Sequence, residues 1–83
     1  MRNNRIPKQV KITAEDPAKF FSEKELQVIR LICGQASNQE IAAKLKRNLR
    51  TIEGYRAGIL DKMKVRNTAG LVIYAVKAGI YKI

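Results

Sequence analysis

The sequence predicts an all-α domain of four helices, preceded by a basic arm that is at most partly ordered. Two observations predict this fold class. From residue 20 onward, apolar residues recur at spacings of three and four, which is the period of a helix. Helix-capping residues stand where each of these periodic stretches begins. At 83 residues the chain has room for one domain with a small core.

The arm comprises residues 1–19 and differs in composition from residues 20–83, which we take as the domain. It contains Pro7 and Pro17 and has few apolar residues. Such a segment cannot bury enough apolar surface to fix its conformation, and proline interrupts regular structure. Its cations include Arg2, Arg5, Lys8 and Lys11.

The first two predicted helices open with the same capping box. Ser22 and Glu25 form the first box, and Ser37 and Glu40 form the second. Gly34 is expected to stop the first helix. Their apolar faces comprise Leu26, Ile29, Ile32 and Cys33 in the first, and Ile41, Ala42 and Leu45 in the second.

The third and fourth predicted helices begin at asparagine or threonine. Asn48 is a suitable N-cap for the third, which spans about residues 49–64. Asn67 or Thr68 caps the fourth, and Gly79 ends it. Their apolar stripes comprise Ile52, Tyr55, Ile59 and Met63 in the third, and Leu71, Val72, Ala75 and Ala78 in the fourth.

Composition excludes several kinds of chemistry. The chain has no His, so it has no histidine base, no Ser-His-Asp triad and no histidine metal ligand. Its single Cys cannot form an internal disulfide or a cysteine-rich zinc site, and Cys33 is expected to be a buried thiol. We therefore expect no enzyme activity and no cofactor.

The same composition indicates location and partner. A lone thiol and the absence of a signal-peptide pattern favour the cytoplasm, and the longest apolar stretch, residues 70–76, is far too short to span a membrane. The net charge of +10 predicts an acidic partner, most often nucleic acid.

Several segments of residues 20–83 together resemble the DNA-binding domain of the LuxR/FixJ/NarL-type (GerE-like) transcriptional regulators. The matching segments are residues 21–26, 34–42, 50–56, 59–63 and 69–80, in the family's order and spacing. The resemblance implies a four-helix domain in which the second and third helices form a helix-turn-helix. It also implies that the fourth helix serves dimerisation, and that a receiver domain, which this chain lacks, can precede the domain in response regulators of two-component systems.

Three positions depart from the common family pattern. Arg47 stands where an aliphatic residue is usual, Asn48 replaces a serine cap, and Tyr55 replaces a histidine. Because burying an arginine is costly, Arg47 is expected to point outward, toward the DNA backbone.

The third helix presents one face away from its apolar stripe. Advancing 100° per residue from Ile52 places four residues there that can read bases in the major groove. Family members contact bases from the matching positions. These residues are Arg50, Glu53, Gly54 and Ala57.

Three residues of the third predicted helix, Gly54, Gly58 and Arg56, can have a structural role in place of a DNA contact. Gly54 and Gly58 are explained either by clearance for packing against the second helix or by close approach to DNA. Arg56 falls on the core-proximal side, where we favour an ion pair, with Glu40 as the candidate partner.

Phosphate contacts are expected from helix starts and from cations around the motif. The candidates are Ser37, Asn38, Lys46, Arg47, Thr51, Lys62, Lys64 and Arg66. A weak two-fold interface is expected on the outer side of the fourth helix, from Gly70, Ile73, Val76 and Lys77.

The sequence thus predicts specific binding of double-stranded DNA for transcription regulation, as a homodimer on DNA. The alternative is a protein-interaction helix-turn-helix module that docks on the transcription machinery, with RNA polymerase as partner. A third interpretation is nonspecific binding through charge alone. The chain is either a stand-alone regulator or the C-terminal part of a response regulator.

Overall fold

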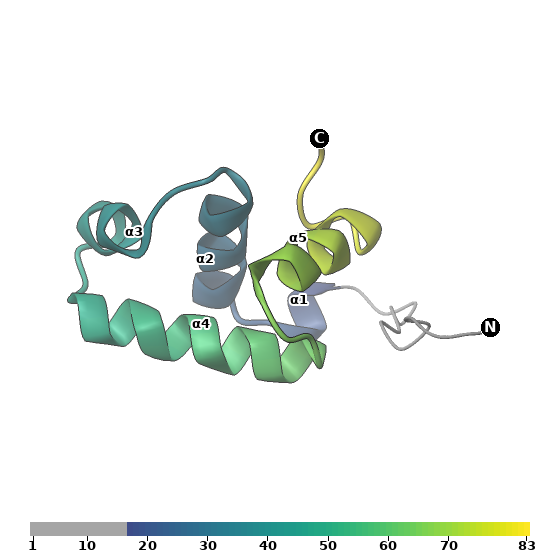
Figure 1. The fold of residues 1–83 in the computed structure, drawn as a ribbon, viewed down its shortest axis with the longest axis horizontal. Helices are drawn as coiled ribbons and strands as arrows, with labels where there is room; N and C mark the ends of the chain where they lie inside the picture. Colours follow the sequence, from purple (N-terminus) through teal and green to yellow (C-terminus); the bar gives the residue numbers. More distant parts are fainter. Residues whose placement is uncertain (1–16) are drawn as a thin grey trace.

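The structure of the chain is a computed structural model that describes residues 17–83 (Figure 1). Residues 1–16, most of the predicted arm, lie outside this description. The helices are α1 (Pro17–Phe20), α2 (Glu23–Cys33), α3 (Asn38–Leu45), α4 (Leu49–Met63) and α5 (Thr68–Lys77). No strand occurs among these residues, so the predicted all-α class with four main helices is confirmed. The one-turn helix α1 was not predicted, and it extends helical structure into residues 17–19 of the predicted arm.

Side-chain caps start each of the four longer helices, as predicted. In the first box, Ser22 Oγ accepts from the N–H of Glu25 at 3.1 Å, and Glu25 Oε1 accepts from the N–H of Ser22 at 2.8 Å. The second box repeats this geometry at 3.1 and 2.7 Å. Asn48 caps α4, accepting from Thr51 N–H at 2.8 Å. Of the two candidates for α5, Asn67 is the cap.

The four longer helices also end alike, each followed within two positions by a residue in the left-handed conformation. These residues are Gln35, Lys46, Lys64 and Gly79, with φ of 74°, 57°, 60° and 79°. The residue after each donates its N–H to the carbonyl five positions back, at 2.8 to 3.1 Å. Gly34 was expected to stop α2, and it is the C-cap, but its φ is −81°. The left-handed conformation is adopted by the next residue, Gln35. A non-glycine residue in this conformation costs about 1–3 kcal/mol.

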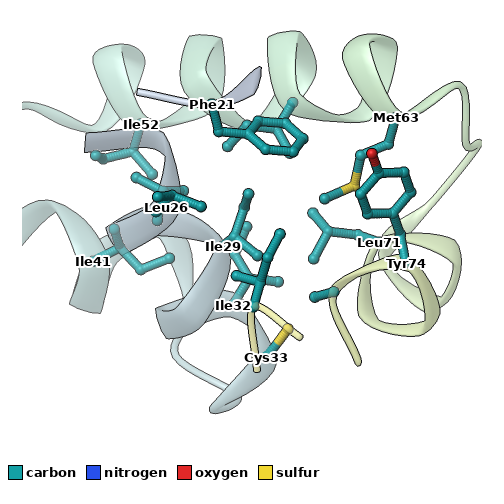
Figure 2. Packing of buried hydrophobic residues seen from close by; sticks show 14 of the residues in the cluster. Phe21, Leu26, Ile29, Ile32, Cys33, Ile41, Ile52, Met63, Leu71 and Tyr74 are labelled. Carbon is teal, nitrogen blue, oxygen red and sulfur yellow. The ribbon is translucent and has the colours of Figure 1, made fainter. Parts of the chain in front are cut away.

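Helix α2 is the centre of the core and packs against α3, α4 and α5 (Figure 2). Its Val28 and Ile29 are fully buried, and Cys33 is buried as expected. Burial raises the pKa of the Cys33 thiol, which keeps it protonated and unreactive. Every predicted apolar position is buried or half-buried. Four buried residues were not predicted as core: Phe21, Val28, Tyr74 and Ile80.

Two contacts hold α5 and the C-terminal segment in place. The Nε of Arg30 donates to the carbonyl of Ile80 at 3.2 Å, which ties α2 to the residues after α5. Gly70 lets α5 approach Val65 closely, because a Cβ at Gly70 would lie 2.9 Å from the Val65 Cβ. None of the described helices has the length and apolar character needed to cross a membrane.

Helix α4 runs along one edge of the molecule, and the other helices lie on one side of it (Figure 1). Its inner stripe, Ile52, Ile59 and Met63, is buried, and Tyr55 is half-buried. The predicted stripe is therefore confirmed. The opposite face of α4 is left uncovered by the described part of the chain.

Candidate nucleic-acid interface

The uncovered face of α4 carries the four residues predicted to read bases. Arg50, Glu53, Gly54 and Ala57 are all exposed, as is Asp61 one turn further along the helix. Their direction follows from the burial of Ile52, Ile59 and Met63 on the other side of the same helix. The start of this face carries the charged side chains of Arg50 and Glu53, and its middle carries only the small residues Gly54 and Ala57.

Gly54 and Gly58 have open space where a side chain would begin. A Cβ built at either position meets no atom within 4 Å. The interpretation that they provide clearance for another helix is therefore wrong for both. With Thr51, Tyr55 and Glu25 they line a shallow, open hollow beside the start of α2. Each glycine lowers the stability of a helix by about 1 kcal/mol relative to alanine. Packing within the described domain does not explain why glycine stands at these two positions.

Exposed cations lie before and after α4. Lys44, Lys46 and Arg47 stand at the end of α3 and in the turn, and Lys64 and Arg66 follow α4. Arg47 is exposed, so the predicted outward direction is confirmed. The backbone of this turn is fixed, because the N–H of Arg47 donates to the carbonyl of Ala42 at 2.9 Å.

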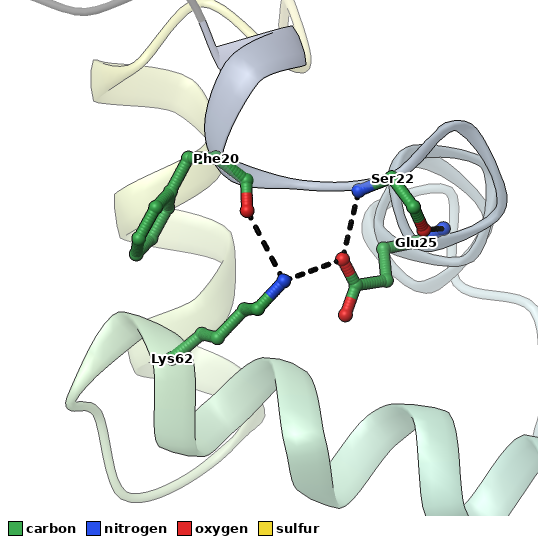
Figure 3. Close-up of polar contacts among 4 residues, drawn as sticks. All are labelled: Phe20, Ser22, Glu25 and Lys62. Carbon is green, nitrogen blue, oxygen red and sulfur yellow. Dashed lines mark hydrogen bonds and ion pairs between the residues drawn. The ribbon is translucent and has the colours of Figure 1, made fainter.

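Unlike the exposed cations, Lys62 is bound by other residues of the domain (Figure 3). Its Nζ lies 2.8 Å from Glu25 Oε1 and donates to the carbonyl of Phe20 at 3.1 Å. The same ammonium lies 5.7 and 5.4 Å from the ring centroids of Phe20 and Phe21. Lys62 thus ties the end of α4 to α1 and to the first turn of α2, and a phosphate would have to compete with a carboxylate for it.

The Glu25 carboxylate serves both the capping box and this ion pair. Burial favours its protonated form, but the hydrogen bond from Lys62, the N–H of Ser22 and the nearby ammonium charge favour the ionised form more strongly. The pKa of Glu25 is therefore lowered from its ordinary value.

Arg56 does not pair with Glu40, so that expectation is wrong. Its Nη1 donates to Asn38 Oδ1 at 3.0 Å, and its Nη2 donates to Thr68 Oγ1. The Glu40 carboxylate instead accepts from the N–H of Ser37, because the capping box holds it at the start of α3. Arg56 thereby joins the first residues of α3 and α5 to the middle of α4.

The remaining predicted phosphate contacts lie at helix starts. Ser37 and Thr51 are exposed, and Asn38 is half-buried. The Ser37 oxygen accepts from the N–H of Glu40, which leaves its hydroxyl hydrogen available to an external acceptor. On the outer side of α5, Ile73 is 51% exposed, Lys77 is exposed, and Gly70 and Val76 are half-buried.

A family model described as bacterial regulatory proteins, luxR family, matches residues 19–75. The chain belongs to this family. It is a LuxR-type helix-turn-helix domain, with α3 and α4 as the two helices of the motif. Members of this family are DNA-binding transcription regulators rather than enzymes.

Individual relatives agree with this assignment. The Oxygen regulatory protein NreC of Staphylococcus haemolyticus is 33% identical over 66 residues, which is 80% of this chain and 30% of that protein. The protein of the same name from Staphylococcus aureus strain JH9 is 37% identical over 62 residues, 75% of this chain and 29% of that protein. The chain thus matches under a third of the length of these relatives.

The Lys62–Glu25 pair makes the stability of this domain depend on pH. A carboxyl whose pKa is lowered on folding stabilises the protein above its unfolded pKa, and this contribution is lost as the pH falls through the folded pKa. We expect Lys62→Met to lower the unfolding free energy by about 0.5–1 kcal/mol at pH 7. The deficit shrinks as the pH falls below the ordinary glutamate pKa of 4.5 and through the lowered pKa of folded Glu25.

The measurement is urea unfolding of both proteins between pH 3 and pH 7. Lys44→Met is the control, because it removes an exposed cation of α3 that pairs with no carboxylate among residues 17–83. A deficit in Lys62→Met that stays constant down to pH 3 would contradict the assignment of the pair.

Proposed function

We propose that this domain binds double-stranded DNA at specific sequences to regulate transcription, with α4 in the major groove. The observation that carries the proposal is the polar, low-relief face of α4, which the core directs outward in a chain of the LuxR family. A major groove of B-DNA admits one α-helix, and the start of such a helix is the part that reaches base edges.

Each residue of this face has a chemical role in the proposal. Arg50 donates two hydrogen bonds to a guanine edge. Glu53 accepts from a cytosine amino group, and its charge disfavours a position near phosphate. Gly54 and Ala57 allow close approach and leave room for a thymine methyl group.

Helix starts and flanking cations would hold the phosphate backbone. We assign this role to exposed or half-buried residues whose side chains retain donors, and we omit Lys62 because Glu25 and the Phe20 carbonyl already engage it. The proposed contacts are Ser37, Asn38, Lys46, Arg47, Thr51, Lys64 and Arg66.

We further propose that two copies associate through α5 when they bind DNA. Ile73 is half exposed and Val76 lies beside it, with Lys77 at the edge. Gly70 is explained by its contact with Val65, so its role in the interface is indirect. A two-fold dimer would match an inverted repeat with half-sites about one helical turn apart.

The relatives are longer, so the whole protein is proposed to contain more than this domain. We place a receiver domain before residues 1–19, which act as linker, and RNA polymerase among the partners. The alternative is a module that docks on the transcription machinery through α4. An exposed apolar surface on α4 would favour it, whereas this face carries Arg50, Glu53 and glycine.

The proposal is tested by selecting bound duplexes from a random DNA library at near-physiological salt and sequencing them. Enrichment of an inverted repeat is expected. Retention of duplexes without enrichment would mean that the charge of +10 alone drives binding.

For Arg50→Ala we expect a loss of about 1–3 kcal/mol in binding to the selected site, together with weaker preference for its guanine. Fluorescence anisotropy at fixed salt measures both, with the cognate and a mismatched duplex. Arg66→Ala is the matched control, since a phosphate contact weakens all duplexes alike. An unchanged affinity for Arg50→Ala would remove this residue from the interface.

Gly54→Ala should stabilise the fold and weaken DNA binding. Alanine within an exposed helix gains about 1 kcal/mol in unfolding free energy, and its Cβ meets no atom of this domain. In the complex the added methyl crowds the groove, and we expect a loss of about 1 kcal/mol in binding. Gln35→Gly, which relieves the left-handed end of α2, controls for added stability alone. Equal or tighter DNA binding by Gly54→Ala would refute close approach at this position.

Ile73→Glu is expected to weaken binding to a duplex with two half-sites more than binding to a single half-site, because a buried carboxylate opposes the α5 contact. Ile83→Glu adds the same charge at an exposed terminal position and is the control. Equal losses on both duplexes for Ile73→Glu would exclude α5 as the interface.

A further inference from the structure

Arg56 is a half-buried cation whose protein partners are all neutral. Its guanidinium donates to the side chains of Asn38 and Thr68, and within residues 17–83 it forms no ion pair. The one acidic residue of α3, Glu40, accepts instead from the backbone N–H of Ser37. The positive charge of Arg56 is therefore not compensated inside the described domain.

The contact with Arg56 fixes the orientation of the Asn38 amide. A guanidinium has only donors, so the group that faces it must be the carbonyl oxygen Oδ1. The amide nitrogen of Asn38, with two donors, then points away from Arg56. No acceptor in the described part of the chain takes these donors.

The same argument applies to Thr68. Its Oγ1 accepts from Arg56 Nη2, so its hydroxyl hydrogen must be directed elsewhere. No acceptor for it occurs among the described residues. One cation thus leaves two neutral side chains, at the starts of α3 and α5, with their donors free.

We infer that Arg56 is a positioning residue that presents Asn38 and Thr68 together as donors to a backbone phosphate of bound DNA. The cluster offers donors and one uncompensated positive charge, which matches an oxyanion and no cation. This inference rests on the proposed function, and it adds Thr68 and Arg56 to the proposed interface. Because Thr68 opens α5, the phosphate contact also anchors the proposed dimer helix to the DNA backbone.

Asn38→Asp separates a DNA role from a structural one. The carboxylate preserves the acceptor for Arg56 and adds an ion pair, so the domain is expected to be at least as stable as the wild type. It removes both outward donors and places a negative charge at the phosphate. We expect DNA affinity to fall about tenfold or more, since a hydrogen bond to a charged group is lost.

Gln39→Glu is the matched control, because it adds the same charge at the next, exposed residue of α3. We expect its affinity to fall less than about threefold. A second pair tests Thr68 without changing charge: Thr68→Val should weaken binding by about threefold to tenfold, and Thr68→Ser should retain it. Urea unfolding of all four variants separates lost affinity from lost fold.

These measurements use wild-type affinity for a non-cognate duplex at low salt as their reference, because phosphate contacts do not depend on sequence. The inference can therefore be judged even where selection finds no preferred site, which would refute only the proposed specificity. Equal affinities for Asn38→Asp and Gln39→Glu, or unchanged binding by Thr68→Val, would show a purely structural cluster. A third outcome is that the wild type binds inorganic phosphate saturably, Asn38→Asp does not, and the two bind DNA equally well. This outcome would identify a free-phosphate site and overturn the proposed DNA contact.

Discussion

The burial of one stripe of α4 is the constraint on which the functional surface depends. Ile52 and Ile59 are fully buried and Met63 almost so, at spacings of seven and four residues. A helix fixed along this line cannot rotate without exposing large aliphatic side chains, which costs about 1.5–3 kcal/mol for each. The direction of Arg50, Glu53, Gly54 and Ala57 is therefore set by buried residues of the core. The proposed specificity of this small domain therefore depends on the core as much as on the exposed face.

Cations in this domain fall into two groups with different roles. Arg30, Arg56 and Lys62 are each bound by oxygen atoms of other elements, and together they join all five helices or the segments beside them. A second group around α3, the turn and the end of α4 is exposed and leaves its charge to solvent or to a ligand: Lys44, Lys46, Arg47, Lys64 and Arg66. Among the first three cations, Lys62 also has its charge paired with a carboxylate, so part of the net charge of +10 is engaged within the fold. Position, more than number, separates the two groups.

Conformational cost is distributed unevenly along the chain. Gly70 is required by packing, since a side chain there would collide with Val65. Gly54 and Gly58 are not required by packing, although each weakens α4. Conversely, Lys46 and Lys64 occupy left-handed positions where glycine would be less strained. Around α4 the sequence thus departs from what would favour stability alone, which is typical of a surface under functional constraint.

Local sequence determined the number of main helices, their caps and the exposed face of α4, because each depends on residues within one or two helical turns. Ser22 with Glu25, and Ser37 with Glu40, are three residues apart, so the pattern and the hydrogen bond coincide. Partners distant along the chain were decided only by tertiary structure. Arg56 meets residues 18 and 12 positions away, and Lys62 meets Glu25 across 37. Periodicity gives the side of a helix on which a residue lies, but it does not say which other helix packs there. For that reason the choice of Asn38 and Thr68 over Glu40 could not be predicted.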